Sequence, residues 1–159
     1  MTDSGKSIQP IPPDLAIIPL TADHLPEVMK IEKASFTDNW PISSFRDLMI
    51  QSRTNWAAVS NGLVAGYLIT QWVLDEIHIL NLAVAAQFRR KGIAAYMLQF
   101  LIASGRKKGS HDLYLEVRTS NEPAKALYER FGFSPLSVRK SYYADGEDAM
   151  VLHKRISRS

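Results

Sequence analysis

The stretch from Glu76 to Val117 constrains the fold more than any other part of the sequence. It predicts, in order, a strand over 76–84, a loop over 85–91, a helix over 92–107 and a strand over 112–117. The helix is amphipathic, with apolar side chains at helical spacing: Ile93, Met97, Leu98, Leu101 and Ile102. Two strands joined through such a helix pair in parallel, with a right-handed crossover. The segment therefore favours a domain of mixed α and β structure.

Shorter elements surround this unit. Asn61-Gly62, between two segments rich in β-forming residues, is the strongest hairpin signal in the chain. The remaining predicted elements are a strand over 15–20, a helix capped by Thr21 or Asp23 and ending near Ser35, a short helix from Pro41 to Met49, strands over 56–60 and 63–72, a helix over 122–131, and two strands that flank the turn 144–146. We expect an α+β domain over 15–156, with a mixed, largely antiparallel sheet of about seven strands flanked by about four helices. A flexible tail is expected over 1–14.

Composition limits what this domain can be. Hydrophobic residues make up 46% of the chain and charged residues 22%, as in ordinary globular proteins. The net charge of +3 is too small to predict nucleic-acid binding. No stretch has the length and apolar character of a membrane span, and the first sixteen residues lack the pattern of a secretory signal. The absence of cysteine excludes a disulfide framework and a cysteine nucleophile, and it is consistent with a cytoplasmic location.

Three cations, Arg89-Arg90-Lys91, stand at the entry to the helix predicted over 92–107. A helix N-terminus already carries roughly half a positive charge, so each cation there is unfavourable by about a few tenths of a kcal/mol. The arrangement is stabilised if a polyanion binds at this end, because free backbone N–H groups point at phosphate oxygens. Gly92 and Ala94 would let the backbone come close to such a ligand. An exposed basic turn is the structural alternative.

Further along the chain, three residues carry groups that could take part in chemistry. Glu116 lies in an apolar strand, where an unpaired carboxylate would be costly. Its structural alternative is a pair with Arg118 or with a lysine. Asn121 stands where the next helix needs an N-cap, and Tyr128 lies on the apolar stripe of that helix. The histidines at positions 24, 78, 111 and 153 show no metal-ligand spacing, so no metal is expected.

The junction before the long helix resembles the signature of the GNAT acetyltransferase superfamily, Arg/Gln-x-x-Gly-x-Gly/Ala. Its Ala member here takes the place of the commoner Gly. The resemblance implies the GNAT fold and acetyl-coenzyme A as the acetyl donor. It also implies that the coenzyme pyrophosphate is bound by Arg89, Arg90, Lys91, Gly92, Ile93 and Ala94, and the acetyl and pantetheine part by the backbone of Leu82, Ala83 and Val84.

The segment from Leu115 to Phe133 resembles a narrower group, the bacterial RimI proteins. These share Leu-Glu-Val-Arg-x-Ser-Asn, then Leu-Tyr, then Gly-Phe, and this chain matches at each position. RimI proteins acetylate the N-terminal amine of a small-subunit ribosomal protein. The resemblance implies that Glu116 is the general base and Tyr128 the general acid, and that Asn121 contacts the coenzyme.

Two loops resemble the segments that bind the acceptor peptide in these acetyltransferases. Tyr142-Tyr143, followed by Ala-Asp-Gly-Glu-Asp-Ala, is similar both to RimI and to the catalytic subunits of eukaryotic and archaeal N-terminal acetyltransferases. In those proteins the tyrosine pair helps to hold the first residues of the substrate. The loop after the first helix, with Phe36 and Trp40, is similar to a segment that lines the peptide site, although both residues could equally belong to the core. Glu32 and Asp38 are additional candidate helpers.

The resemblance therefore implies direct acetyl transfer, in a ternary complex, to the α-amine of a protein with a small first residue such as Ala or Ser. A ribosomal protein is the substrate that the RimI match suggests. The alternatives are a GNAT acetyltransferase that acts on a small-molecule amine, and a non-catalytic ribosome-binding module. The sequence does not determine the oligomeric state.

Overall fold

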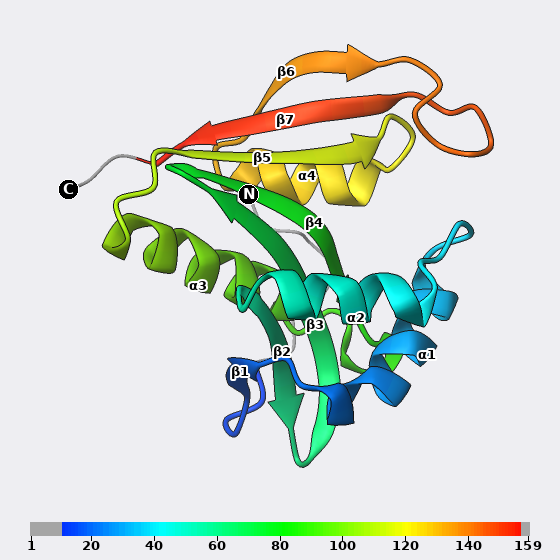
Figure 1. Cartoon of the computed structure of the whole chain (residues 1–159), viewed down its shortest axis with the longest axis vertical. Helices are drawn as coiled ribbons and strands as arrows, with labels where there is room; N and C mark the ends of the chain where they lie inside the picture. The colour runs from blue at the N-terminus through cyan, green and yellow to red at the C-terminus, as the bar shows by residue number, and fades with distance from the viewer. Residues whose placement is uncertain (1–10, 157–159) are drawn as a thin grey trace, which may run out of the picture. The chain divides into compact units, whose positions relative to one another are not determined.

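The computed structural model describes residues 11–156, so most of the tail expected over 1–14 lies outside the described residues. The elements in chain order are β1 (Ala16–Pro19), η1 (Ala22–His24), α1 (Leu25–Ser35), α2 (Ile42–Gln51), β2 (Asn55–Ser60), β3 (Leu63–Val73), β4 (Glu76–Val84), η2 (Ala86–Phe88), α3 (Ile93–Lys107), β5 (Asp112–Arg118), α4 (Glu122–Arg130), β6 (Ser134–Arg139) and β7 (Ala149–Arg155). Figure 1 labels the strands and the α-helices along the chain. The first predicted helix begins later than expected, because Thr21 caps the 3₁₀ turn η1 rather than α1.

The strands form one hydrogen-bonded sheet in the order β1-β2-β3-β4-β5-β7-β6. β4 and β5 pair in parallel, from Glu76–Asp112 to Ile79–Leu115, whereas β1–β2, β5–β7 and β6–β7 pair antiparallel. The seven-stranded mixed sheet, the four α-helices and the parallel pair predicted around the long helix are therefore confirmed. The predicted hairpin is also confirmed, with left-handed φ values of 52° at Asn61 and 74° at Gly62 between β2 and β3.

Two compact units make up the chain. The first comprises the described residues of Met1–Leu68 together with Leu82–Gln99, and the second comprises Ile69–Asn81 with the described residues of Phe100–Ser159. In the first unit, the core forms where α1, α2 and the β2–β3 hairpin pack. Phe45 is completely buried there, with its ring centroid 5.7 Å from that of Tyr67 in an edge-on contact.

In the second unit, the two faces of β5 differ. Leu113, Leu115 and Val117 are buried, and the alternate side chains Glu116 and Arg118 are only partly covered. This period of two is what a strand with one face in the core requires. β5 pairs with β7 along its whole length, from Asp112–Arg155 to Arg118–Ala149. The strand that carries Glu116 is thus held on a regular frame.

Gly66 allows β3 to approach the end of β4 closely. A Cβ atom at this position would lie 2.7 Å from the backbone oxygen of Ala83 and 3.0 Å from Cε of Met97. Gly105 in α3 is different, because its Cβ would meet the ends of two flexible side chains, Ile77 at 2.8 Å and Ile156 at 2.9 Å. A backbone oxygen cannot move aside as a terminal methyl group can, so the glycine is required at 66 and only favoured at 105.

We expect Gly66→Ala to lower the free energy of unfolding by about 1–3 kcal/mol, as overpacking of a close-packed site does. Gly105→Ala should change it by less than about 1 kcal/mol, because the gain in helix propensity offsets the local crowding. Urea denaturation of both variants measures the difference. Equal effects of the two substitutions would contradict this account of the β3–β4 contact.

Candidate functional site

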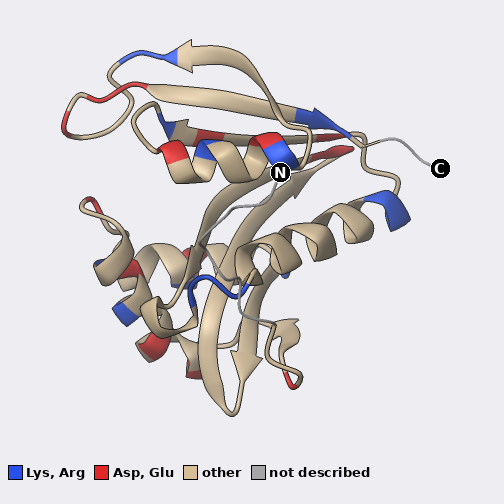
Figure 2. Cartoon of the chain, turned by 180° about the vertical axis from the view of Figure 1, so that it is seen from behind, with Lys and Arg blue, Asp and Glu red and all other residues tan. Residues whose placement is uncertain are grey.

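The cation-bearing junction adopts a sharply turned backbone before α3. Arg90 has a φ of 65° and Gly92 a φ of 77°, both in the left-handed region. An arginine is rare in that region, and such strained residues cluster at functional sites. Figure 2 shows the basic residues of this loop as a short blue segment between η2 and α3. The geometry suits the predicted anion site, because the first N–H groups of a helix have no partner within the helix and can bind an anion.

Arg89 has an additional role that its sequence position did not reveal. Its Nε donates to the backbone oxygen of Val84 at 3.2 Å, and its Nη2 donates to Oγ of Ser35 at 3.4 Å. The side chain therefore ties the end of β4 to the last residue of α1. Ser35 directly precedes Phe36, so within the first unit one arginine joins the loop predicted to bind the coenzyme to the loop predicted to line the peptide site.

Trp40 belongs partly to the core. Its ring centroid is 5.3 Å from that of Phe45, and its backbone N–H donates to Oε2 of Glu32 at 2.9 Å. Phe36 and Trp40 are both only partly exposed. The sequence left two interpretations of Trp40 open, a core residue or a residue that lines the peptide site. The two are compatible, because one side of the ring packs inward while the side chain still reaches the surface.

Glu32, a candidate catalytic helper, has clear structural contacts. Glu32 is 1% exposed, and its Oε1 accepts a short hydrogen bond from the hydroxyl of Tyr67. Its other oxygen holds the backbone of Trp40. A buried carboxylate needs such donors, and this one joins β3, which carries Tyr67, to the loop after α1, which carries Trp40. Asp38 is exposed in that loop.

Glu116 projects from the partly covered face of β5, with 20% of its side chain exposed. Its carboxylate lies 3.8 Å from Nε of Arg139 on β6. Arg139 also lies over the ring of Tyr142, at 5.5 Å from the centroid. The structural alternative that paired Glu116 with Arg118 is wrong: the Arg118 guanidinium turns toward Asp145 and Glu147. Side-chain alternation alone does not explain this outcome, because Glu116 and Arg118 lie on the same face of β5. Arg118 pairs instead with the carboxylates of the loop between β6 and β7.

Asn121 and Tyr128 take the structural positions that the sequence suggested. The Asn121 side chain accepts from the backbone N–H of Ala124 at 3.2 Å and so caps α4. Tyr128 is 7% exposed and packs edge-on against Phe133, with centroids 5.4 Å apart. Burial raises the pKa of the Tyr128 hydroxyl above its ordinary value. Neither observation tests the catalytic and coenzyme roles, which stay predictions.

The Tyr128 hydroxyl has no hydrogen-bond partner among the residues that the structure describes. Within that part of the chain, every fully buried polar side-chain atom does have a partner. The ring of Tyr128 is buried and packs against Phe133. A phenol in this position keeps its proton at neutral pH and can donate it to a bound group.

The tyrosine pair is fixed by charged neighbours that sequence reasoning missed. Tyr142 and Tyr143 pack edge-on, with centroids 5.0 Å apart, and the Arg118 guanidinium lies 4.1 Å from the centre of the Tyr143 ring. Hydrogen bonds, first from Ser120 and then from Arg118, lower the pKa of Glu147 to about 2. The available signal was the run of carboxylates in a short turn, Asp145, Glu147 and Asp148, which requires cations or N–H donors nearby.

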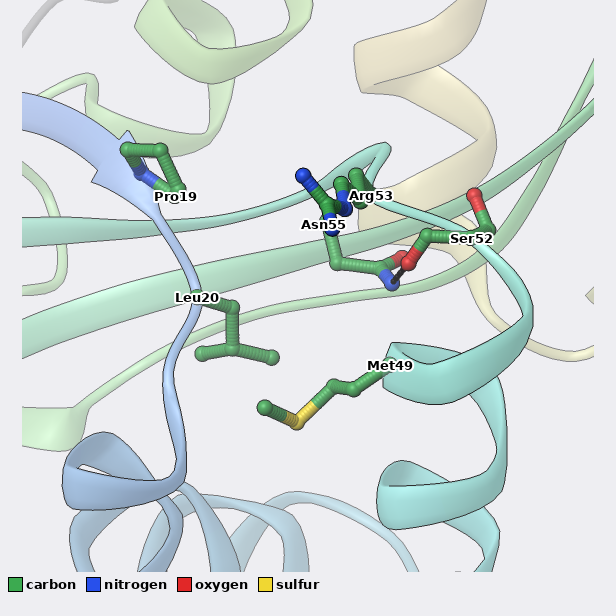
Figure 3. Close-up of a pocket in the computed structure, with 6 residues that line it drawn as sticks. All are labelled: Pro19, Leu20, Met49, Ser52, Arg53 and Asn55. Atoms are coloured by element: carbon green, nitrogen blue, oxygen red, sulfur yellow. Dashed lines mark hydrogen bonds between the residues drawn. The ribbon is translucent and has the colours of Figure 1, made fainter.

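A pocket of about 250 Å³ lies elsewhere in the first unit (Figure 3). It is lined by Pro19, Leu20, Met49, Ser52, Arg53 and Asn55. None of these is a predicted site residue, so the pocket does not mark the predicted chemistry. Over residues 11–156, no group of three or more potential metal ligands is found, and no helix has the length and apolar character needed to cross a membrane.

The fold and these residues together define a class of protein. A mixed sheet whose central strand leads through a cationic, glycine-containing turn into a long helix presents a helix N-terminus to a phosphate-bearing ligand. Within the second unit, Glu116 supplies a carboxylate and Tyr128 a phenol, two groups of the kind that can transfer protons.

Comparison with known proteins agrees with this class. The model of the acetyltransferase (GNAT) family matches residues 25–133. The ribosomal protein bS18-alanine N-acetyltransferase of Escherichia coli strain K12 is 37% identical over 141 residues, which cover 87% of this chain and 95% of that protein. An N-alpha-acetyltransferase of Saccharolobus solfataricus is 33% identical over 144 residues, covering 82% and 86% of the two chains.

The structural comparison gives the same result. The crystal structure of the ribosomal-protein-S18-alanine N-acetyltransferase from Escherichia coli superposes with a TM-score of 0.83 and 36% identity, covering 91% of this chain and 96% of that one. The chain belongs to the acetyltransferase (GNAT) family. The GNAT fold and the RimI-like resemblance expected from the sequence are both confirmed.

The contacts of Glu147 predict a pH-dependent contribution to stability. A carboxyl group whose pKa is lower in the folded than in the unfolded state stabilises the fold above the unfolded-state pKa, and loses this contribution as the pH falls. For Glu147 the window runs from the ordinary value of 4.5 down to about 2. We expect Glu147→Gln to be less stable than the wild type near neutral pH, with the difference shrinking through this window. Urea denaturation at several pH values measures it, and a pH-independent difference would contradict the assignment.

Proposed function

We propose that this protein transfers the acetyl group of acetyl-coenzyme A to the N-terminal α-amine of a protein with a small first residue, such as Ala or Ser. The observation that carries the proposal is the 37% identity to a ribosomal protein bS18-alanine N-acetyltransferase over nearly the whole chain. The archaeal N-alpha-acetyltransferase supports the same reaction. A ribosomal protein is the particular acceptor proposed, and the cytoplasm is the proposed location.

The residues of the junction before α3 fit the coenzyme. Arg89, Arg90 and Lys91 supply positive charge, and the left-handed conformation of Arg90 and Gly92 turns the chain into the helix. Backbone N–H groups from Gly92 to Ala94 would bind the pyrophosphate. The backbone of Leu82, Ala83 and Val84, at the end of β4, would hold the acetyl and pantetheine part, with Asn121 as an additional contact. Acetyl-coenzyme A supplies the acetyl group as a thioester.

The acceptor must lose a proton before or during its attack on the thioester. An α-amine has an ordinary pKa of about 7.7–8.0, against about 10.4 for lysine. Near pH 7.5, roughly a third of α-amines are already neutral, but only about a thousandth of lysines. One carboxylate is therefore enough help for an α-amine, and Glu116 supplies it by accepting the amine proton directly or through a water. Phe36, Trp40, Tyr142 and Tyr143 would hold the first residues of the acceptor.

The carboxylates of the acidic loop are poor alternatives to Glu116 as the base. Hydrogen bonds hold the pKa of Glu147 at about 2 and lower those of Asp145 and Asp148 from their ordinary value. A general base is most effective when its pKa lies near the working pH, so these three groups are poor proton acceptors. Tyr128 would donate its proton to the leaving sulfur. The transfer is direct, and a trapped acetyl-enzyme under single-turnover conditions would contradict it.

The test is the release of free coenzyme A in the presence of two peptides. The first begins Ala-Arg with a free amine, and the second has the same sequence with a blocked N-terminus and an internal lysine. We expect turnover of the first peptide only, and a fall in kcat of about 10²–10⁴-fold in Glu116→Gln, because a positioned base contributes that factor. The melting temperature of the variant should stay close to that of the wild type.

Three other results would contradict the proposal. Preference for the lysine peptide would exclude N-terminal acetylation. Better turnover of a small amine, such as a polyamine, would favour the small-molecule acetyltransferase. Release of no coenzyme A with any acceptor, together with co-sedimentation with ribosomes, would favour a binding module without catalysis.

Tyr128→Phe tests the general acid separately. Phenylalanine keeps the ring that packs on Phe133 and removes only the hydroxyl. We expect kcat for the free-amine peptide to fall by about 10²-fold, with little change in stability, since proton donation is lost and packing is kept. Tyr114→Phe is the matched control, because Tyr114 lies on β5 and has no proposed role. Equal activities of the two variants would exclude Tyr128 as the acid.

A further inference from the structure

The loop between β6 and β7 is joined to β5 through one arginine. Nη1 of Arg118 donates to Oδ2 of Asp145 at 2.9 Å and to Oε1 of Glu147 at 2.9 Å, and its guanidinium lies 4.1 Å from the centre of the Tyr143 ring. We call Arg118, Tyr143, Asp145 and Glu147 the Arg118 clamp. Only 20% of the Arg118 side chain is exposed, so these contacts are partly shielded from water. One planar side chain thus holds two carboxylates and a ring.

Glu147 links the clamp to a second segment. Its Oε2 accepts from the backbone N–H of Ser120 at 2.8 Å and from Oγ1 of Thr119 at 3.3 Å. The backbone N–H of Thr119 donates to the carbonyl oxygen of Asp148 at 3.2 Å. These bonds join the β6–β7 loop to the turn between β5 and α4. That turn leads directly to Asn121, the cap of α4.

The loop also has bonds of its own that do not involve Arg118. The Ser141 backbone N–H donates to Oδ1 of Asp148 at 2.9 Å, the Gly146 N–H to the oxygen of Tyr143 at 2.9 Å, and the Tyr143 N–H to the oxygen of Glu147 at 3.1 Å. The turn can therefore close without Arg118. What the clamp adds is the direction of the Tyr143 ring relative to β5, the strand that carries Glu116.

We propose that Arg118 is a positioning residue for the acceptor peptide: it fixes the Tyr143 ring in the orientation that receives the first residues of the acceptor. This rests on the proposed function, in which the tyrosine pair holds the peptide. In this role Arg118 touches neither substrate. Its effect passes through Tyr143, so loss of the guanidinium weakens peptide binding and leaves acetyl-coenzyme A binding and the chemical step intact.

The test compares Arg118→Ala, Tyr143→Ala and the double variant in the assay of coenzyme A release. We expect Arg118→Ala to raise the KM for the free-amine peptide about tenfold, the size of effect that a lost, partly desolvated cation–π contact with its ion pairs gives. The KM for acetyl-coenzyme A, kcat and the melting temperature should stay within about twofold or a few degrees of the wild type. Because Arg118 acts through Tyr143, the double variant should be no worse than Tyr143→Ala alone.

Two further variants test the role of Arg118 more closely. Arg118→Lys keeps the charge but loses the planar fork, so its KM for the peptide should lie between those of the wild type and Arg118→Ala. Arg155→Ala is the matched control. Arg155 also pairs with a carboxylate, Asp112 at 3.5 Å, but it lies at the other end of β7 and has no link to the loop. Its kinetic constants should be those of the wild type.

Each remaining outcome overturns the inference. A peptide KM within twofold of the wild type in Arg118→Ala rejects the positioning role. If Arg118→Ala loses affinity for both substrates and also has a lower melting temperature, the role of Arg118 is purely structural. If the effects of the two substitutions add in the double variant, Arg118 acts independently of Tyr143. If the wild type itself releases no coenzyme A with the free-amine peptide, the proposed function fails and the positioning role fails with it.

Discussion

The parallel pairing of β4 with β5 is the constraint on which the other features depend. Parallel strands cannot be joined by a tight turn, so the chain must leave the sheet after β4, form α3 and return. The pairing extends from Glu76–Asp112 to Ile79–Leu115, although β4 continues to Val84 and β5 to Arg118. The turn that enters α3 is therefore a necessary feature of the topology, and in this chain it carries the three consecutive cations. β5, the return strand, carries Glu116.

Electrostatics explain why this turn gives the strongest sequence signal among the predicted site residues. Cations at a helix N-terminus oppose the helix dipole, so the sequence contains an unfavourable arrangement that only a ligand would relieve. The left-handed φ at Arg90 is a second departure of the same kind, and it is visible only in the structure. The cations and the left-handed φ lie within a few residues of each other. Unfavourable local features are expected to cluster in this way where a chain binds a ligand.

Secondary structure was predictable from the sequence because its signals are local. Asn61-Gly62 specifies its hairpin through the backbone preferences of two adjacent residues, and the apolar period of α3 specifies its buried face. Side-chain partners were not predictable in this way. Glu116 meets Arg139 because β5, β7 and β6 adopt a particular register, with an irregularity between Pro135 and Ser137. A single sequence contains no signal for that register, so Arg118 was the natural but wrong choice of partner.

The different surroundings of two glutamates in the second unit show how similar side chains can have separate tasks. Glu147 accepts hydrogen bonds from Arg118, Thr119 and Ser120, and its pKa is lowered to about 2, so it is a permanent anion suited to holding structure. Glu116, on the adjoining strand, has only a long contact with Arg139 among the described residues. A carboxylate that leaves most of its acceptor sites open can still take a proton from an incoming amine. The hydrogen-bond donors of this unit thus distinguish Glu147, the anion that holds Arg118 in place, from Glu116, the carboxylate that we propose as the base.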